Sequence, residues 1–172
     1  MLSDLEIIQI LLICGKMKKH KMKKTVLITG ATSGIGKATA QILAKNNYKV
    51  ILCGRRKDRL EELEKELSAF TEVHSLEFLV RNKKEVLEKI GALPNDFSAI
   101  DVLINNAGNA HGLDPIQNGN LDDWDAMIDI NLKGLLYVSK AIIPQMVERQ
   151  SGHIINIGST AAKEVYPNGN EY

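Results

Sequence analysis

The residues with the clearest chemical potential form a glycine-rich stretch at residues 29–36, which reads TGATSGIG. It follows an apolar run and opens a segment, residues 33–46, whose apolar side chains recur at helical spacing. Gly30 can adopt backbone angles that a Cβ would forbid, so the chain can turn sharply after a strand. Gly34 and Gly36 would let the backbone approach a phosphate group, to which the start of the helix offers unpaired N–H groups. The stretch therefore indicates either a nucleotide-phosphate site or an ordinary strand-to-helix turn.

A second candidate group is Arg55-Arg56, which follows Gly54 after the apolar run at residues 49–53. In open α/β sheets the ligand lies beyond the carboxyl ends of the strands, and NAD-preferring sites commonly place a carboxylate at this point. Two guanidiniums suit a 2′-phosphate instead, because arginine forms bidentate, charge-assisted hydrogen bonds with phosphate. Their position favours NADP(H) over the alternative of a solvated basic turn.

Two further groups follow apolar runs nearer the C-terminus. Asn105-Asn106-Ala107-Gly108 ends the run at residues 100–105, and Gly158-Ser159-Thr160 ends the run at residues 153–159. Asn and Gly are common in turns, so the first group alone predicts no more than a turn. Small side chains there would also leave room for a flat cofactor ring.

Strand-like and helix-like segments alternate along the rest of the chain. Predicted strands occupy residues 25–29, 49–53, 73–80, 100–105 and 153–159, and predicted helices occupy residues 33–46, 58–68, 83–90 and 121–149. This alternation predicts an α/β fold, namely a Rossmann-type doubly wound parallel sheet in a three-layer α/β/α arrangement. We interpret residues 25–172 as one such domain, incomplete at its C-terminus, and residues 1–24 as an N-terminal extension outside the fold.

Composition narrows the class of protein. The 172 residues carry a formal net charge of +1, which excludes a strongly basic nucleic-acid binder. The apolar run near the N-terminus is too short to span a bilayer, so we expect no membrane partner. Cys14 and Cys53 are far apart, which favours reduced thiols and a cytoplasmic location. The four histidines are scattered without the spacing of a metal site, so we expect no bound metal.

Taken together, these motifs resemble the short-chain dehydrogenase/reductase family. TGATSGIG, NNAG, Asn131 within the predicted long helix, Ser159 and Tyr172 occur in the family's order and spacing. The stretches GRRKDRLEELEKEL, HGLDP and GHIINIGSTAA further resemble the bacterial NADP-dependent 3-hydroxy acid dehydrogenases of this family, which act on serine, L-allo-threonine and related acids.

This resemblance implies an NADP(H)-dependent oxidoreductase that exchanges a hydride with a CH–OH or C=O group. Tyr172 would be the acid/base, Ser159 would hydrogen-bond the substrate oxygen, and Asn131 would hold a water at a helix bend. His111 and Asp114, in the loop after NNAG, could line the substrate site, but we favour the interpretation that both are solvated loop residues. The implied cofactor contacts are Gly30, Thr32, Ser33, Gly34, Ile35, Gly36, Arg55, Arg56, Val80, Asn106, Ala107 and Gly108.

Three departures from the family pattern stand out. The family has a lysine four positions after the tyrosine, whereas this sequence ends at Tyr172, so we expect little or no turnover by this chain alone. Leu79 stands where relatives commonly have an Asp that binds the adenine amino group, a loss worth about one hydrogen bond, or roughly 1 kcal/mol. Gly158 replaces a common serine, but Ser159 keeps the register.

Alternative functions stay open at this point. The substrate could be another carbonyl compound, such as a 3-oxoacyl thioester or a sugar, or the chain could bind a nucleotide without chemistry. Asn131, Ser159 and Tyr172 argue against the non-catalytic alternative, because a pure binder needs none of them. The resemblance also implies that the full-length form is a homo-oligomer, a tetramer in many relatives.

Overall fold

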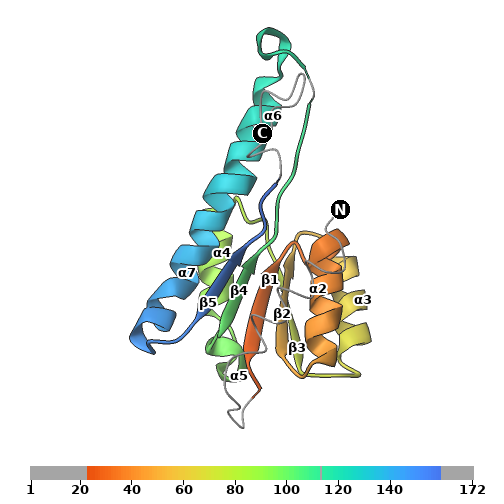
Figure 1. Ribbon diagram of the computed structural model, residues 1–172, viewed down its shortest axis with the longest axis vertical. Coiled ribbons are helices and arrows are strands. Elements are labelled where there is room, and N and C mark those ends of the chain that lie inside the picture. Colours follow the sequence, from red (N-terminus) through yellow and green to blue (C-terminus); the bar gives the residue numbers. More distant parts are fainter. Residues whose placement is uncertain (1–22, 113, 160–172) are drawn as a thin grey trace.

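The computed structural model describes residues 23–112 and 114–159, which form a five-stranded parallel sheet (Figure 1). The strands lie in the order β3-β2-β1-β4-β5, so the chain starts in the middle of the sheet and builds outward in both directions. This arrangement confirms the predicted doubly wound α/β class. The strands are β1 (Thr25–Thr29), β2 (Lys49–Gly54), β3 (Val73–Glu77), β4 (Val102–Asn105) and β5 (His153–Asn156).

Helices cover both faces of this sheet. Figure 1 shows α2 and α3 on one side of the sheet and α4 and α7 on the other. The long helix that ends in α7 extends well beyond the strands, past their carboxyl ends. The helical segments are α2 (Gly34–Lys45), α3 (Lys57–Leu67), α4 (Lys83–Gly91), α5 (Asn95–Ser98), η1 (Ile116–Asn118), α6 (Leu121–Met127), η2 (Ile128–Gly134) and α7 (Leu135–Glu148).

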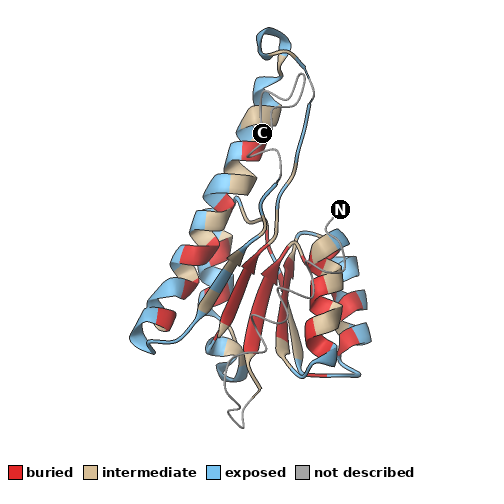
Figure 2. Ribbon diagram, in the orientation of Figure 1, coloured by how far each residue is buried: buried red, intermediate tan, exposed pale blue. Residues whose placement is uncertain are grey.

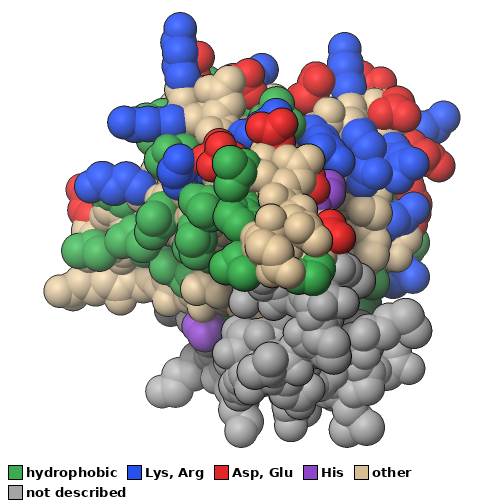
Figure 3. All heavy atoms as spheres, turned by 90° about the horizontal axis from the view of Figure 1, so that it is seen from above, with side chains coloured by type: hydrophobic (Ala, Val, Ile, Leu, Met, Phe, Trp, Pro, Cys, Tyr) green, Lys and Arg blue, Asp and Glu red, His purple; other side chains and the backbone are tan. Residues whose placement is uncertain are grey.

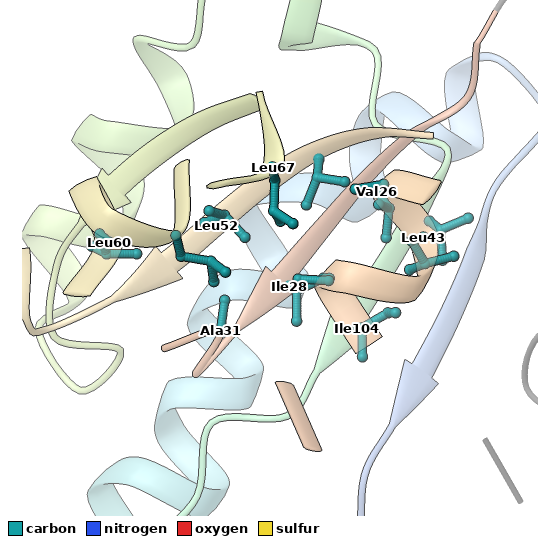
Figure 4. Packing of buried hydrophobic residues seen from close by; sticks show 13 residues of the cluster. Val26, Ile28, Ala31, Leu43, Leu52, Leu60, Leu67 and Ile104 are labelled. Carbon is teal, nitrogen blue, oxygen red and sulfur yellow. The ribbon is translucent and has the colours of Figure 1, made fainter. Parts of the chain in front are cut away.

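The alternation of side chains along each strand divides the core into two layers. Val26 and Ile28 of β1 pack toward α2 and α3, where Leu43 and Leu60 meet them (Figure 4). Leu27, between them in sequence, packs on the opposite face with residues of α4 and α7. The central strands are buried on both faces (Figure 2), which explains why they read as nearly continuous apolar runs.

Several predicted boundaries were wrong. The strand predicted at residues 73–80 ends at Glu77, because its neighbour β2 ends at Gly54 and leaves the next residues without a partner strand. The strand predicted at residues 153–159 ends at Asn156 for the same reason, since β4 ends at Asn105. The run at residues 153–159 is mostly apolar, as is typical of a buried parallel strand, but β5 lies at the edge of the described sheet and Ile154 is 37% exposed.

The helix predicted at residues 121–149 is not uniformly α-helical. The seven residues of η2 form a π-helix that joins α6 to α7. Lys133 in η2 donates to Asp129 Oδ1 over 2.7 Å, and this hydrogen bond raises the pKa of the lysine. This helix exposes Ile128, Leu132 and Leu136. Figure 3 shows hydrophobic side chains gathered on one half of the molecule.

Other predictions can be compared only in part. Cys53 is a free, buried thiol whose burial raises its pKa, so it stays protonated. Cys14 and residues 1–22 lie outside the described residues, so the predicted extension stays a prediction. Within residues 23–112 and 114–159, no helix is long and apolar enough to cross a membrane, and no cluster of His, Cys, Asp and Glu is suited to a metal.

Candidate nucleotide-binding site

The glycine-rich turn leaves the start of α2 open to an anion. Gly30 and Gly34 have φ values of 65° and 53°, in the left-handed region that a side chain disfavours. Ser33 is the N-cap residue of α2, but its hydroxyl does not bond the helix backbone. It accepts a hydrogen bond from Arg56 Nη2 over 2.9 Å instead. The first N–H groups of α2 therefore lack a side-chain cap and remain donors for an anionic group.

A latch of hydrogen bonds joins this turn to the NNAG turn after β4. The side-chain amide of Asn106 donates to the carbonyls of Thr29, over 2.9 Å, and Gly30, over 3.2 Å. The buried Thr29 hydroxyl in turn accepts from the N–H groups of Asn106 and Ala107, each over 3.0 Å. A Cβ at Gly36 would overlap both Gly30 O and the Asn106 amide. The absence of a Cβ at Gly36 therefore allows the glycine-rich turn and the NNAG turn to approach each other closely.

A cavity of about 460 Å³ opens at the carboxyl ends of the strands, where these turns meet. The predicted cofactor contacts line it, except Gly34 and Gly36. The complete lining is Gly30, Thr32, Ser33, Ile35, Gly54, Arg55, Arg56, Phe78, Leu79, Val80, Arg81, Asn106, Ala107, Gly108, Asn109, His111 and Ile130. Ligand contacts themselves stay predictions.

Arg55 and Arg56 differ in their surroundings although they are adjacent. Arg56 is half-buried, and its guanidinium donates to Thr32 Oγ1 over 2.7 Å as well as to Ser33 Oγ. This arginine therefore fixes the glycine-rich turn from the side of β2. Arg55 is exposed at the rim of the cavity and makes no hydrogen bond or ion pair within the described part of the chain, so its charge is free for a ligand.

The π-helix η2 holds the loop that follows NNAG. Asn131 in η2 accepts from Asn109 N over 2.9 Å and donates to Asn109 O over 2.8 Å, so one side chain satisfies both backbone groups of Asn109. A Cβ at Gly134 would lie 2.8 Å from Val80 Cγ2, so this glycine lets the helix approach the loop after β3. Such π-helical segments often occur at functional sites. The helix therefore shapes two walls of the cavity.

Asn131→Ala is expected to loosen the loop after NNAG. Two buried or half-buried hydrogen bonds would be lost, each worth about 1 kcal/mol. We expect the Asn109 amide to exchange with deuterium at least tenfold faster and the unfolding free energy to fall by about 1–2 kcal/mol. Lys133→Ala in the same π-helix is the control, because its exposed pair with Asp129 does not touch the loop. Unchanged exchange at Asn109 in the Asn131 variant would refute this role.

The predicted catalytic residues are only partly placed. Asn131 is positioned as described, Ser159 is exposed shortly after β5, and neither lines the cavity. Tyr172 lies outside the described residues. His111, interpreted as a solvated loop residue, is exposed and lines the cavity. Asp114 is exposed and is not part of the lining.

Sequence reasoning did not identify Gly54, Phe78, Arg81, Asn109 or Ile130 as cavity-lining residues. Arg81 could have been found, because a basic residue directly after the strand predicted at residues 73–80 lies at the same sheet edge as Arg55. Ile130 and Asn109 carried no such signal, since their place depends on how the long helix packs.

Comparison with known proteins agrees with this fold. The family profile for short chain dehydrogenases matches residues 24–172, and the chain belongs to this family. It is 46% identical over 147 residues to an NADP-dependent 3-hydroxy acid dehydrogenase from Escherichia coli O6:H1, covering 86% of this chain and 58% of that protein. The chain thus spans little more than half the length of this relative.

Two solved structures resemble the described fold. A serine dehydrogenase from Escherichia coli superposes with a TM-score of 0.80 at 44% identity, covering 86% of this chain and 68% of the other. The closed form of a serine dehydrogenase in complex with NADP⁺ also superposes with a TM-score of 0.80, at 45% identity, covering 86% of this chain and 59% of the other.

Proposed function

We propose that this chain carries the NADP(H) site of an oxidoreductase that acts on a small 3-hydroxy acid of the serine or L-allo-threonine type. The observation that carries the proposal is the cavity in which the glycine-rich turn, Arg55 and the NNAG turn come together. The similarity to an NADP-dependent 3-hydroxy acid dehydrogenase supports the substrate class.

The residues present fit a phosphorylated dinucleotide. The uncapped N–H groups at the start of α2 suit the pyrophosphate. Arg55, exposed at the rim beside the loop after β2, suits the 2′-phosphate of the adenosine ribose. Because β4 lies on the other side of β1 from β2, the small residues after β4 would lie beside the second nucleoside. Bound NADP(H) would supply the hydride donor or acceptor at its nicotinamide ring.

The chain's own residues would transfer the proton of the substrate hydroxyl. Ser159 would hold the substrate oxygen by a hydrogen bond, and the Tyr172 phenol would take the hydroxyl proton during oxidation or return it during reduction. Asn131 would act as a positioning residue, since its side chain fixes the loop at Asn109. A lysine downstream of Tyr172 would complete the proton transfer.

We propose further that the full-length protein is cytoplasmic and assembles as a homo-oligomer, a tetramer by analogy with its family. The buried, reduced thiol of Cys53 supports a reducing compartment. The exposed apolar residues of the long helix, Ile128, Leu132 and Leu136, support assembly, because such a stripe is costly in water.

The test is to titrate the full-length protein, including its natural sequence after residue 172, with NADPH and NADH and to follow nicotinamide fluorescence. Oxidation of L-serine and L-allo-threonine with NADP⁺ is then measured against a 3-oxoacyl thioester and a sugar. We expect tighter binding of NADPH than of NADH, and turnover of the hydroxy acids. Binding without any turnover would favour the non-catalytic alternative, and turnover of only another carbonyl compound would refute the substrate class.

A further inference from the structure

The part of the cavity formed by the loop after NNAG and by η2 contains a histidine that the proposed cofactor contacts do not use. The residues that line this part are Gly108, Asn109, His111 and Ile130. Among them only His111 can carry a positive charge. Because β2 and β4 lie on opposite sides of β1, this loop and the loop with Arg55 start on opposite sides of the glycine-rich turn. His111 is therefore a candidate for binding an anion other than the cofactor phosphates.

The backbone of the loop after NNAG is held against the long helix. Asn131 bonds both backbone groups of Asn109, and His111 N donates to the sulfur of the buried Met127 over 3.4 Å. These bonds use the backbone on both sides of Ala110 and leave the imidazole out. The His111 side chain is exposed and makes no hydrogen bond or ion pair with any described residue. The helix thus fixes where the histidine stands, while its ring stays available to a ligand.

No carboxylate of the described chain competes for this imidazole within the cavity. The described lining contains no acidic side chain. Asp129, next to Ile130 in η2, accepts a hydrogen bond from Lys133 Nζ over 2.7 Å. Asp114 follows His111 in the same loop but does not line the cavity. An anion that enters beside His111 would therefore meet a hydrogen-bond donor and no like charge from the described lining.

The sheet brings the loop with His111 next to the segment with Ser159. Strands β4 and β5 are parallel neighbours, with Asn105 opposite Asn156. Ile157 N donates to Asn105 O over 2.9 Å, which continues this contact past the end of β5. His111 and Ser159 therefore follow adjacent strands at the same edge of the sheet. In a 3-hydroxy acid a single carbon atom separates the carbinol carbon from the carboxylate carbon, so the groups that bind the hydroxyl and the carboxylate must lie close together.

We propose that His111 binds the carboxylate of the substrate and makes the site selective for hydroxy acids over neutral alcohols of the same shape. The inference deepens the proposed function and rests on it, because Ser159 is taken to hold the substrate hydroxyl. An imidazole donates one hydrogen bond when neutral and two when protonated, and a hydrogen bond to a carboxylate is strengthened by the charge of the acceptor. His111 is a binding residue here and exchanges no proton with the substrate.

The experiment compares L-serine with L-serinamide as substrates of the full-length protein with NADP⁺. The two compounds have nearly the same shape, but the amide is neutral where serine has its carboxylate. We expect kcat/KM, followed by the absorbance of the NADPH formed, to favour L-serine by about tenfold or more. A substrate pair of this kind tests carboxylate recognition on the unmodified protein, so the test does not depend on how any variant folds.

His111→Ala is expected to lower kcat/KM for L-serine about 30-fold, the scale of a hydrogen bond to a charged group, and that for L-serinamide less than about threefold. The loss should appear in KM with little change in kcat, because the carboxylate is bound equally in the ground state and the transition state. His111→Gln keeps a neutral donor and is expected to recover about fivefold of the loss.

Gln117→Ala is the matched control, since Gln117 is an exposed polar residue in η1 that does not line the cavity. It should leave kcat/KM for both substrates unchanged. Fluorescence titration of the His111→Ala protein with NADPH is the second control. We expect an unchanged dissociation constant, because the proposed cofactor contacts do not include His111.

The outcomes separate this inference from the proposed function. If the unmodified protein oxidises L-serinamide as well as L-serine, the carboxylate is not recognised and the inference alone is overturned. If His111→Ala leaves L-serine oxidation unchanged, lowers kcat/KM equally for both substrates, or weakens NADPH binding, His111 does not read the carboxylate and the inference is again overturned. If the full-length protein oxidises no hydroxy acid, the proposed substrate class falls and this inference with it.

Discussion

Replacing Arg55 and Arg56 together by alanine is expected to weaken NADPH binding about 100-fold, or roughly 3 kcal/mol, and NADH binding by no more than about fivefold. The difference between the two cofactors is the 2′-phosphate. Hydrogen bonds to a charged group contribute about 1.5–3 kcal/mol each, so the loss of Arg55 at this phosphate, together with the turn loosened by the loss of Arg56, accounts for the expected weakening. The described lining of the cavity contains no carboxylate that would favour NADH binding by accepting hydrogen bonds from its free ribose hydroxyls.

The single variants are expected to differ in kind. Arg55 is exposed and free of protein partners within the described chain, so Arg55→Ala should reduce the affinity for NADPH alone. Arg56 also holds the hydroxyls of Thr32 and Ser33, so Arg56→Ala should loosen the turn that binds the shared pyrophosphate. We therefore expect Arg56→Ala to weaken NADH as well as NADPH, each by several-fold.

Fluorescence titration of both dinucleotides at two salt concentrations measures these effects. Added salt screens the exposed arginine, so the NADPH preference should shrink as the salt concentration rises. Arg59→Ala is the control, because Arg59 is an exposed cation one turn into α3 that does not line the cavity. Equal losses for NADPH and NADH in Arg55→Ala would show that the 2′-phosphate does not lie at this residue.

Local sequence predicted the fold because each strand is an apolar run next to a recognisable turn. The predicted bounds of β1 match the structure, since this central strand pairs with β2 along its whole length and with β4 over Val26–Ile28. The end of β3 was wrong because a strand ends where its partner ends, and that depends on Gly54 rather than on residues 78–80 themselves. The apolar run there continues as cavity lining, which has the same composition as a strand.

The site could be predicted as far as its motifs are contiguous. Three motifs can be recognised by their residue types and by their position after a predicted strand: the glycine-rich turn, Arg55-Arg56 and NNAG. The role of Asn131 as a clamp on Asn109 could not be read from spacing, because it depends on a π-helix within an otherwise helical pattern. Arg81 was missed because it fell between the strand predicted at residues 73–80 and the helix predicted at residues 83–90 and was given no role.

Gly36→Ala is expected to be the most disruptive small substitution in the turn. A Cβ at this position would overlap Gly30 O, a backbone atom, and the Asn106 amide that latches the two turns together. Overpacking of this kind costs about 1–3 kcal/mol, which exceeds the roughly 1 kcal/mol that alanine gains over glycine in a helix. We expect a lower melting temperature and an NADPH affinity reduced about 100-fold, because both walls of the phosphate site would have to move apart.

Gly91→Ala provides the matched control, since Gly91 also lies in a helix but a Cβ there would meet nothing within 4 Å. It should leave NADPH binding unchanged and raise stability by up to about 1 kcal/mol. Gly34→Ala distinguishes the effect of a steric clash from that of backbone strain. An added Cβ there also meets nothing within 4 Å, whereas the φ of 53° is unfavourable for alanine. If Gly36→Ala bound NADPH as tightly as the Gly91 variant, the latch between the glycine-rich turn and Asn106 would not be needed to hold the cofactor.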